Sequence, residues 1–161
     1  MTHQVTEGRP TPLGVTVHGD GVNVAVFSAH AERIEWCTFD ADGVETRHAL
    51  EHRTGDIWHA HISGFGAGTR YGLRAHGPHE PLSGHRFNAN KLLIDPYAHA
   101  VEGPLRWAEP MSGFASGPDD DLTASTVDSA PVVPQSVVVT PDFDWQGDTP
   151  PRRSTSHPVI Y

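Results

Sequence analysis

The 161-residue sequence has few basic residues and no long apolar run, and both absences exclude classes of binding partner. It has one lysine, Lys91, and its 11 basic residues against 20 acidic ones give a formal net charge of -9. A chain with this balance has no basic patch for a nucleic acid. No run of residues approaches the roughly 18 apolar positions that a membrane span needs. We therefore expect neither a nucleic acid nor a membrane as a partner.

Cysteine is almost absent as well. Cys37 is the only one, so no disulfide can form within the chain. Its setting in the strand-like run RIEWCTFD predicts a half-buried thiol. The N-terminal residues MTHQVTEGRPTPLG have no apolar segment of signal-peptide length. These features favour a cytoplasmic location.

Helical periodicity is missing too, and an alternation with period two takes its place. The alternation predicts three successive pairs of short strands, over residues 15–17, 22–27, 33–39, 44–50, 56–62 and 70–76. Turns with glycine separate them, such as His18-Gly19-Asp20-Gly21. This pattern indicates an all-β fold, an immunoglobulin-like antiparallel β-sandwich over residues 13–98 that follows an N-terminal tail of residues 1–12.

Beyond the predicted strands the chain becomes rich in turns. Residues 74–98 combine Gly and Pro turns with the apolar residues Phe87, Leu92, Leu93, Ile94 and Tyr97. A long loop with its own apolar anchors is expected to pack against something. Residues 99–157 are mostly polar with many Pro and Gly, which predicts a long irregular connector.

Motifs for catalysis or metal binding are weak. His59 and His61 share one strand face, but no Cys or placed carboxylate completes a tetrahedral metal site, so surface histidines are the better interpretation. Cys37 has no catalytic signature around it, and no G-x-S-x-G motif occurs. We assign no catalytic residue, no metal site and no cofactor.

Tryptophan is the residue that could contact a sugar, since the C–H face of a glucose ring packs well on an indole. Trp36 and Trp58 each share a strand face with apolar residues, which favours core packing for both. Trp107 and Trp145 lie in irregular segments, where docking and sugar stacking are both open. Trp58 and Trp107 are the candidate carbohydrate contacts.

Several long runs together resemble one family. They are GRPTPLGVTVHGDGVNVAVFSAHAERIEWCTFD, GDIWHAHISGFGAGTRYGLRAHGP, GHRFNANKLLIDPYA and DSAPVVPQSVVVTPDFDW. In this order they resemble the N-terminal region, a family 48 carbohydrate-binding module, of bacterial isoamylase-type glycogen debranching enzymes in the α-amylase superfamily (glycoside hydrolase family 13). The resemblance covers nearly the whole chain.

The resemblance implies a function that continues beyond these residues. In the family a β-sandwich module precedes a TIM barrel that hydrolyses α-1,6-glucosidic branch linkages in glycogen and limit dextrins. Residues 158–161 look like the start of the first barrel strand, so this chain alone is expected not to be catalytic. The implied partners are an α-glucan and the chain's own barrel.

The same resemblance implies that the loop of residues 74–98 contacts both the sandwich and the barrel, and we call this predicted interdomain contact the seam. Its predicted contacts are Arg86, Phe87, Asn88, Asn90, Lys91, Leu92, Leu93 and Tyr97. Two alternatives stay open beside the debranching module. One is a stand-alone glycan-binding or regulatory β-sandwich without enzymatic activity, and the other is a non-functional truncation product.

Overall fold

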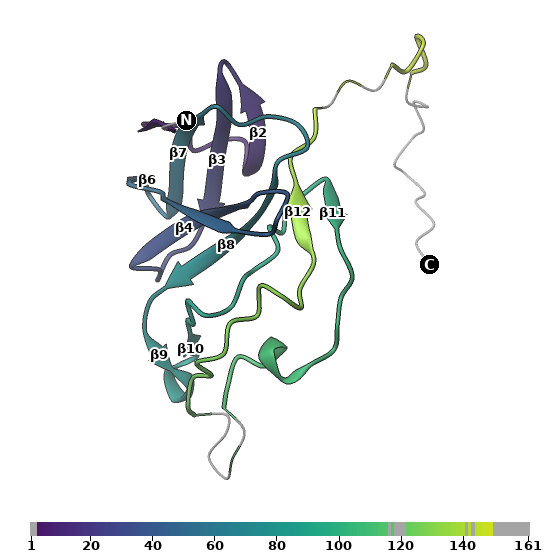
Figure 1. The fold of residues 1–161 in the computed structure, drawn as a ribbon. Helices are drawn as coiled ribbons and strands as arrows, with labels where there is room; N and C mark the ends of the chain where they lie inside the picture. The colour runs from purple at the N-terminus through teal and green to yellow at the C-terminus, as the bar shows by residue number, and fades with distance from the viewer. Residues whose placement is uncertain (1–2, 116, 118–121, 141, 143, 150–161) are drawn as a thin grey trace, which may run out of the picture.

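The computed structural model describes residues 3–115, 117, 122–140, 142 and 144–149, which form two antiparallel sheets that face each other (Figure 1). The first sheet has the order β1-β7-β3-β2, with β6 also paired to β7. Its strands are β1 (Val5–Thr6), β2 (Gly14–His18), β3 (Gly21–Phe27), β6 (His52–Thr54) and β7 (Ile57–Ser63).

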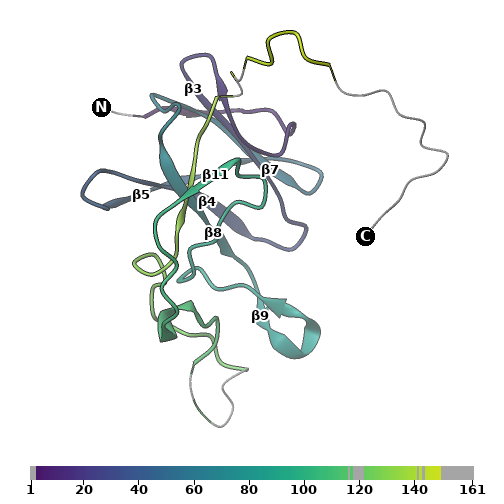
Figure 2. The same cartoon turned by 90° about the vertical axis from the view of Figure 1, so that its right-hand side faces the viewer.

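The second sheet has the order β11-β12-β8-β4-β5 (Figure 2). Its strands are β4 (Arg33–Phe39), β5 (Glu45–Ala49), β8 (Arg70–His76), β11 (Ala100–Glu102) and β12 (Gln135–Val137). A separate hairpin pairs β9 (His79–Glu80) with β10 (His85–Arg86) around the 3-10 helix η1 (Pro81–Ser83), and η2 (Glu109–Met111) follows later. The predicted all-β, immunoglobulin-like antiparallel sandwich is confirmed.

The six predicted strands are β2, β3, β4, β5, β7 and β8, and their pairing differs from the prediction in one respect. β2 pairs with β3, and β4 pairs with β5, as expected. β7 and β8, the third predicted pair, lie in different sheets, because β7 pairs with β3 and β8 pairs with β4. The glycine-rich residues between them therefore cross from one sheet to the other.

The segments outside the predicted strands also contribute to the sheets. Within the predicted tail, β1 pairs with β7 at Val5 and Ile62. Within the predicted connector, β12 pairs with β8 and β11 pairs with β12. The predicted barrel strand, residues 158–161, lies outside the described residues.

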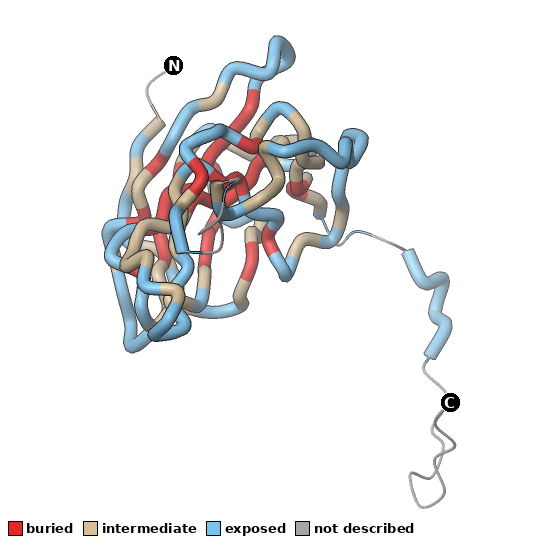
Figure 3. The backbone as a smooth tube through the Cα atoms, turned by 90° about the horizontal axis from the view of Figure 1, so that it is seen from below, coloured by how far each residue is buried: buried red, intermediate tan, exposed pale blue. Residues whose placement is uncertain are grey.

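The main core lies between the facing sheets (Figure 3). Trp36 is 0% exposed at its centre, with its ring centroid 5.0 Å from that of Phe65 in an edge-on contact. Both sheets contribute alternate residues to this core, as period two requires. They are Val22, Val24, Ala60 and Ile62 from the first sheet and Ile34, Trp36, Tyr71 and Leu73 from the second.

A second apolar cluster covers the outer face of the second sheet. Cys37 and Phe39 pack there against Leu92, with Ala130 and Val133 beside them. Leu92 comes so close to β8 that a Cβ on Gly72 would lie 2.6 Å from its Cδ1 atom. Cys37 is thus fully buried, not half-buried as predicted, because residues distant in sequence cover it, and burial raises the pKa of its thiol.

A buried guanidinium holds the covering segments in place. Arg74 of β8 is fully buried, and its Nε and Nη2 donate to Glu45 of β5 at 2.7 and 2.6 Å. Nη2 also donates to Asp128 at 2.9 Å, and Nη1 donates to the carbonyl of Ala89 at 2.9 Å. One side chain therefore joins the sheet to the loop at residue 89 and to the connector at residue 128.

Replacing this arginine should destabilise the fold strongly. We expect Arg74→Leu to lower the free energy of unfolding by about 3 kcal/mol, since a buried pair that loses one partner leaves an uncompensated charge. Urea unfolding at pH 7.5 measures the change. Arg47→Leu is the matched control, because Arg47 is half-exposed and its contact with Glu45 is a surface pair worth at most about 1 kcal/mol. Equal losses in the two variants would contradict the role of Arg74.

Buried titratable groups also make the stability depend on pH. His48 and His59 are both buried, and burial lowers the pKa of each imidazole, with His3 and His52 adding to the effect. Burial acts to raise the pKa of Glu45, but the hydrogen bonds and charge of Arg74 outweigh it and lower that pKa. The pKa of Asp128 is lowered in the same way by the Ala130 N–H and Arg74.

These shifts predict two losses of stability on acidification. A histidine with a lowered pKa stabilises the fold above its ordinary value of 6.5, and that stability falls as pH drops below it. A carboxylate with a lowered pKa stabilises above its ordinary value near 4, and loses this contribution at lower pH. Urea unfolding at pH 7.5, 5.5 and 3.5 should show both steps, and His48→Gln should reduce the first. The exposed His99→Gln is the control, and a wild-type stability that stays flat from pH 7.5 to 5.5 would refute the first step.

Candidate functional site

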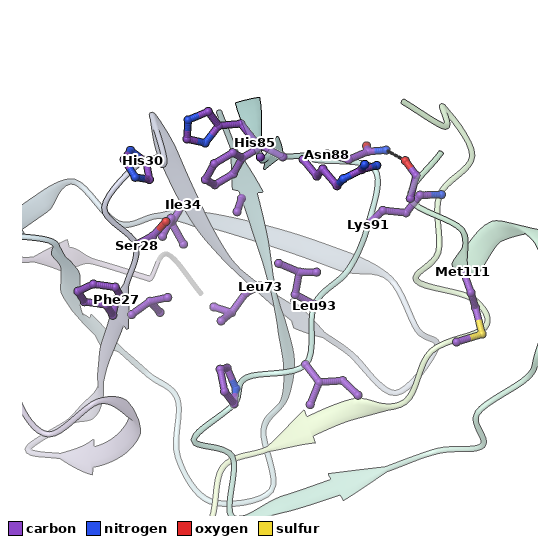
Figure 4. Close-up of a pocket in the computed structure, with 18 residues that line it drawn as sticks. Phe27, Ser28, His30, Ile34, Leu73, His85, Asn88, Lys91, Leu93 and Met111 are labelled. Atoms are coloured by element: carbon purple, nitrogen blue, oxygen red, sulfur yellow. Dashed lines mark hydrogen bonds between the residues drawn. The ribbon is translucent and has the colours of Figure 1, made fainter. Parts of the chain in front are cut away.

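The described residues form a groove of about 770 Å³ (Figure 4). It lies where the end of β3 and the following loop meet β8 and the loop of residues 84–96. A volume of this size falls within the range of small-molecule sites. Its lining residues are Val26, Phe27, Ser28, His30, Ile34, Leu73, Ala75, Gly84, His85, Arg86, Phe87, Asn88, Lys91, Leu93, Ile94, Pro96, Met111 and Gly113.

The groove has an apolar floor, which we define as Phe27, Ile34, Leu73, Leu93 and Ile94. Ile34 and Leu73 belong to the core, whereas Phe27, Leu93 and Ile94 are 61%, 46% and 41% exposed. Leu93 is fixed there by its backbone, which exchanges two hydrogen bonds of 2.8 and 2.9 Å with Leu73 of β8. Large apolar side chains thus remain open to solvent at a defined place.

Polar side chains form a rim along the floor, which we define as Ser28, His30, His85, Arg86, Asn88 and Lys91. In Figure 4, His30 and His85 lie side by side above the apolar residues, and Asn88 and Lys91 continue the row. The two imidazole centroids are 4.8 Å apart, with 64° between the ring planes. The groove therefore offers an apolar surface with hydrogen-bonding groups along one side.

Three of the predicted seam residues are used within the chain itself. The Lys91 ammonium is buried and donates to the Pro110 and Val127 carbonyls and the Ser125 hydroxyl, at 2.8, 2.6 and 3.1 Å. Burial lowers the pKa of this ammonium. The Asn88 amide donates to the carbonyls of Gly113 and Ser125, and Leu92 is buried in the second cluster. These side chains tie the loop of residues 84–96 to the connector.

The other predicted seam residues differ in exposure. Phe87 is half-buried against the core, at a point where a Cβ on Gly77 would lie 2.7 Å from its ring. Asn90, Arg86, Leu93 and Tyr97 are exposed. The seam with a barrel stays a prediction, and these exposed side chains are the ones that a covering surface could reach.

The two candidate sugar contacts lie in unlike surroundings. Trp58 of β7 is half-buried, donates from its Nε1 to the Ser28 carbonyl at 3.0 Å, and has the Arg53 guanidinium 5.2 Å from its ring centroid. Trp107 is 85% exposed in the connector. Its neighbour Arg106 is fixed by a backbone bond of 3.0 Å to Val132. Trp107 is therefore presented to solvent from an anchored segment, and Trp58 is part of the fold.

The histidines on β7 are not the surface pair that the sequence predicts. His59 is 2% exposed, and its Nε2 lies 2.8 Å from the Thr54 hydroxyl of β6, a strand that the alternation did not reveal. His61 lies 3.0 Å from the His18 carbonyl. In the part of the chain that the structure describes, no group of three His, Cys, Asp or Glu side chains is arranged for a metal ion. The same part contains no helix long and apolar enough to cross a membrane.

Phe27 and His30 are groove residues that sequence reasoning did not single out. Phe27 ends a strand whose preceding residues are buried, and this end position was the available signal for exposure. For His30 the sequence offered no such signal. It lies 55 positions from His85, and the two residues come together only because β4 pairs with β8. The sequence alone does not show which distant residues the fold brings together.

Comparison with known proteins gives long matches along the sequence. The chain is 52% identical over 154 residues to a glycogen debranching enzyme of Klebsiella pneumoniae subsp. pneumoniae, covering 96% of this chain and 22% of that protein. It is 47% identical over 158 residues to a glycogen debranching enzyme of Salmonella gallinarum, covering 98% of this chain and 23% of that protein. The chain thus spans less than a quarter of the length of these relatives.

One solved structure and one family complete the comparison. A multi-modular glycogen-degrading pneumococcal virulence factor, solved as a product complex, superposes with a TM-score of 0.57 at 17% identity, over 88% of this chain and 13% of that one. This likeness supports the sandwich fold. The carbohydrate-binding module 48 family (isoamylase N-terminal domain) matches residues 12–98, more than half of the sequence. The chain therefore belongs to the carbohydrate-binding module 48 family.

Proposed function

We propose that this chain is the N-terminal module of a glycogen debranching enzyme that hydrolyses α-1,6-glucosidic branch linkages in glycogen or limit dextrin. The observation that carries the proposal is the identity of 52% and 47% to glycogen debranching enzymes over 96% and 98% of the chain. We assign the hydrolysis itself to the part of the relatives' length that these residues do not span. The proposal places the enzyme in the cytoplasm, where the lone thiol of Cys37 stays reduced.

The module's own share in this function is contact with the α-glucan. Family membership supports a carbohydrate ligand, and the exposed indole of Trp107 supplies a flat apolar surface on which a glucose ring can pack. Trp58 is less suited to contact a sugar, because its Nε1 already donates to the Ser28 carbonyl and the Arg53 guanidinium lies over its ring. We therefore place the sugar contact at Trp107.

The second role that we propose for the module is contact with the rest of the enzyme. Leu93, Ile94 and Tyr97 are 46%, 41% and 53% exposed on one short loop. Adjacent exposed apolar side chains of this size are typical of a surface that another domain covers. We propose that they face the catalytic barrel, as the seam prediction requires.

Electrophoresis through a gel that contains glycogen tests the sugar contact. The chain should be retarded, and Trp107→Ala should raise the apparent dissociation constant about two- to tenfold, since an aromatic contact is worth about 0.5–1.5 kcal/mol. Trp145→Ala is the matched control, because Trp145 is also exposed, at 67%. Unchanged mobility of the wild-type chain would count against glucan binding. If Trp107→Ala is retarded as strongly as the wild-type chain, Trp107 is not the glucan contact.

The seam is tested by substitutions at neighbouring apolar residues of the same loop. The double variant Leu93→Gln, Ile94→Gln should leave the melting temperature of the 161-residue chain within about 2 °C, because these side chains lose little burial. In a longer enzyme with the barrel, the same change should lower it clearly. Leu92→Gln is the control, because Leu92 is 4% exposed and loss of such a side chain costs about 2–5 kcal/mol in either protein. An unchanged melting temperature of the longer double variant would refute the seam.

A further inference from the structure

The lining of the groove has a charge bias that the chain as a whole does not share. The full sequence carries a net charge of -9, yet none of the described residues that line the groove is Asp or Glu. Two of them are cationic, Arg86 and Lys91, and two are histidines, His30 and His85. A neutral glucan needs no such bias, since hydroxyl groups bind equally well beside carboxylates.

The two histidines are placed to act together. They come from different segments, the loop after β3 and strand β10, and their ring centroids are 4.8 Å apart. Among the described residues their ring nitrogens have no hydrogen-bond partner, and each ring contacts the other. Two imidazoles at this spacing can both donate to one group that carries several oxygens.

The charged groups around this pair are few. Lys91 adds positive charge to the groove, but its three donors are directed to oxygens of the chain. Arg86 follows His85 on β10 and also lines the groove. The nearby carboxylates are Glu80, opposite His85 across the hairpin, and Glu32, two residues after His30. Neither carboxylate lines the groove or forms an ion pair with the two histidines.

We propose that the groove binds a phosphorylated glucose unit, with the phosphoryl group at His30 and His85 and the sugar ring over Phe27. The inference rests on the proposed α-glucan function and names the chemical form of the ligand. A phosphate monoester carries about -1.5 to -2 charges near neutral pH and three acceptor oxygens, which match two imidazole donors. Phe27, which is 61% exposed, offers an apolar surface to the C–H face of the ring, and the groove of about 770 Å³ is large enough for a glucose unit.

Such a ligand has two sources, a free sugar phosphate or a phosphoryl group on a glucan chain. Both present the same phosphorylated glucose, so binding to both is expected from the rim. A neutral maltodextrin would lack the contact to the histidines. The comparison of these ligands separates the role of the phosphoryl group from that of the sugar.

Titration calorimetry and NMR chemical-shift mapping of the 161-residue chain test the proposal. At pH 6.0, glucose 6-phosphate should bind about tenfold more tightly than glucose or inorganic phosphate, and a phosphorylated dextrin should bind more tightly than maltoheptaose. The shifts should centre on residues 27–30 and 85.

Variants identify the groups responsible. His30→Ala, in an exposed loop, should reduce the preference for glucose 6-phosphate at least fivefold, and His85→Ala should do the same. The exposed His18→Ala, away from the groove, is the matched control and should leave the preference unchanged. Glu80→Gln should strengthen binding about twofold, and this measurement does not depend on the stability of a histidine variant.

Equal binding of glucose and glucose 6-phosphate, or a preference that survives both histidine variants, would overturn the inference. Retention by glycogen with no preference for phosphate would overturn the inference alone. Loss of all glucan and sugar-phosphate binding would overturn the proposed glucan contact together with it.

Discussion

The buried guanidinium of Arg74 is the constraint on which the outer layer of this protein depends. A cation that is 0% exposed is tolerated only where acceptors surround it, and the acceptors come from Glu45, Ala89 and Asp128. These three residues lie on a strand, on the loop after β10 and in the connector. Satisfying one side chain therefore fixes the positions of three distant segments. Without them, Cys37 and Phe39 would face water on the outer side of the second sheet.

The same kind of anchoring shapes the groove. Lys91 and Asn88 donate to carbonyls and a hydroxyl of residues 110–127, so the loop of residues 84–96 is held by polar contacts as well as by the apolar packing of Phe87 and Leu92. Leu92 packs into the second cluster, and the next two residues, Leu93 and Ile94, remain partly exposed at the groove. The exposed floor is thus a consequence of how the loop is attached. It also shows that part of the predicted connector is a layer of the same folded body.

Local patterns in the sequence were sufficient for most of the sandwich. Period-two alternation located six strands, and turn glycines such as Gly19, with φ of +61°, separated them. Short strands were missed because β6 and β11 have three residues each, too few for an alternation to be recognised. The crossing of residues 63–69 was missed because a glycine-rich link fits a hairpin and a crossover equally well. The groove could not be foreseen, since it depends on contacts such as that of His30 with His85 that only the sheet pairing creates.

The contrast between global and local charge bears on which ligands the groove can accept. At physiological ionic strength, charges are screened beyond about 8 Å, so a ligand within the groove responds mainly to the rim and much less to the net charge of -9. A long polyanion extends past the rim and meets the acidic remainder of the surface, where it is repelled. A single phosphoryl group is small enough to lie wholly beside His30 and His85. The acidic chain that has no patch for a nucleic acid can therefore still favour one phosphate on a sugar.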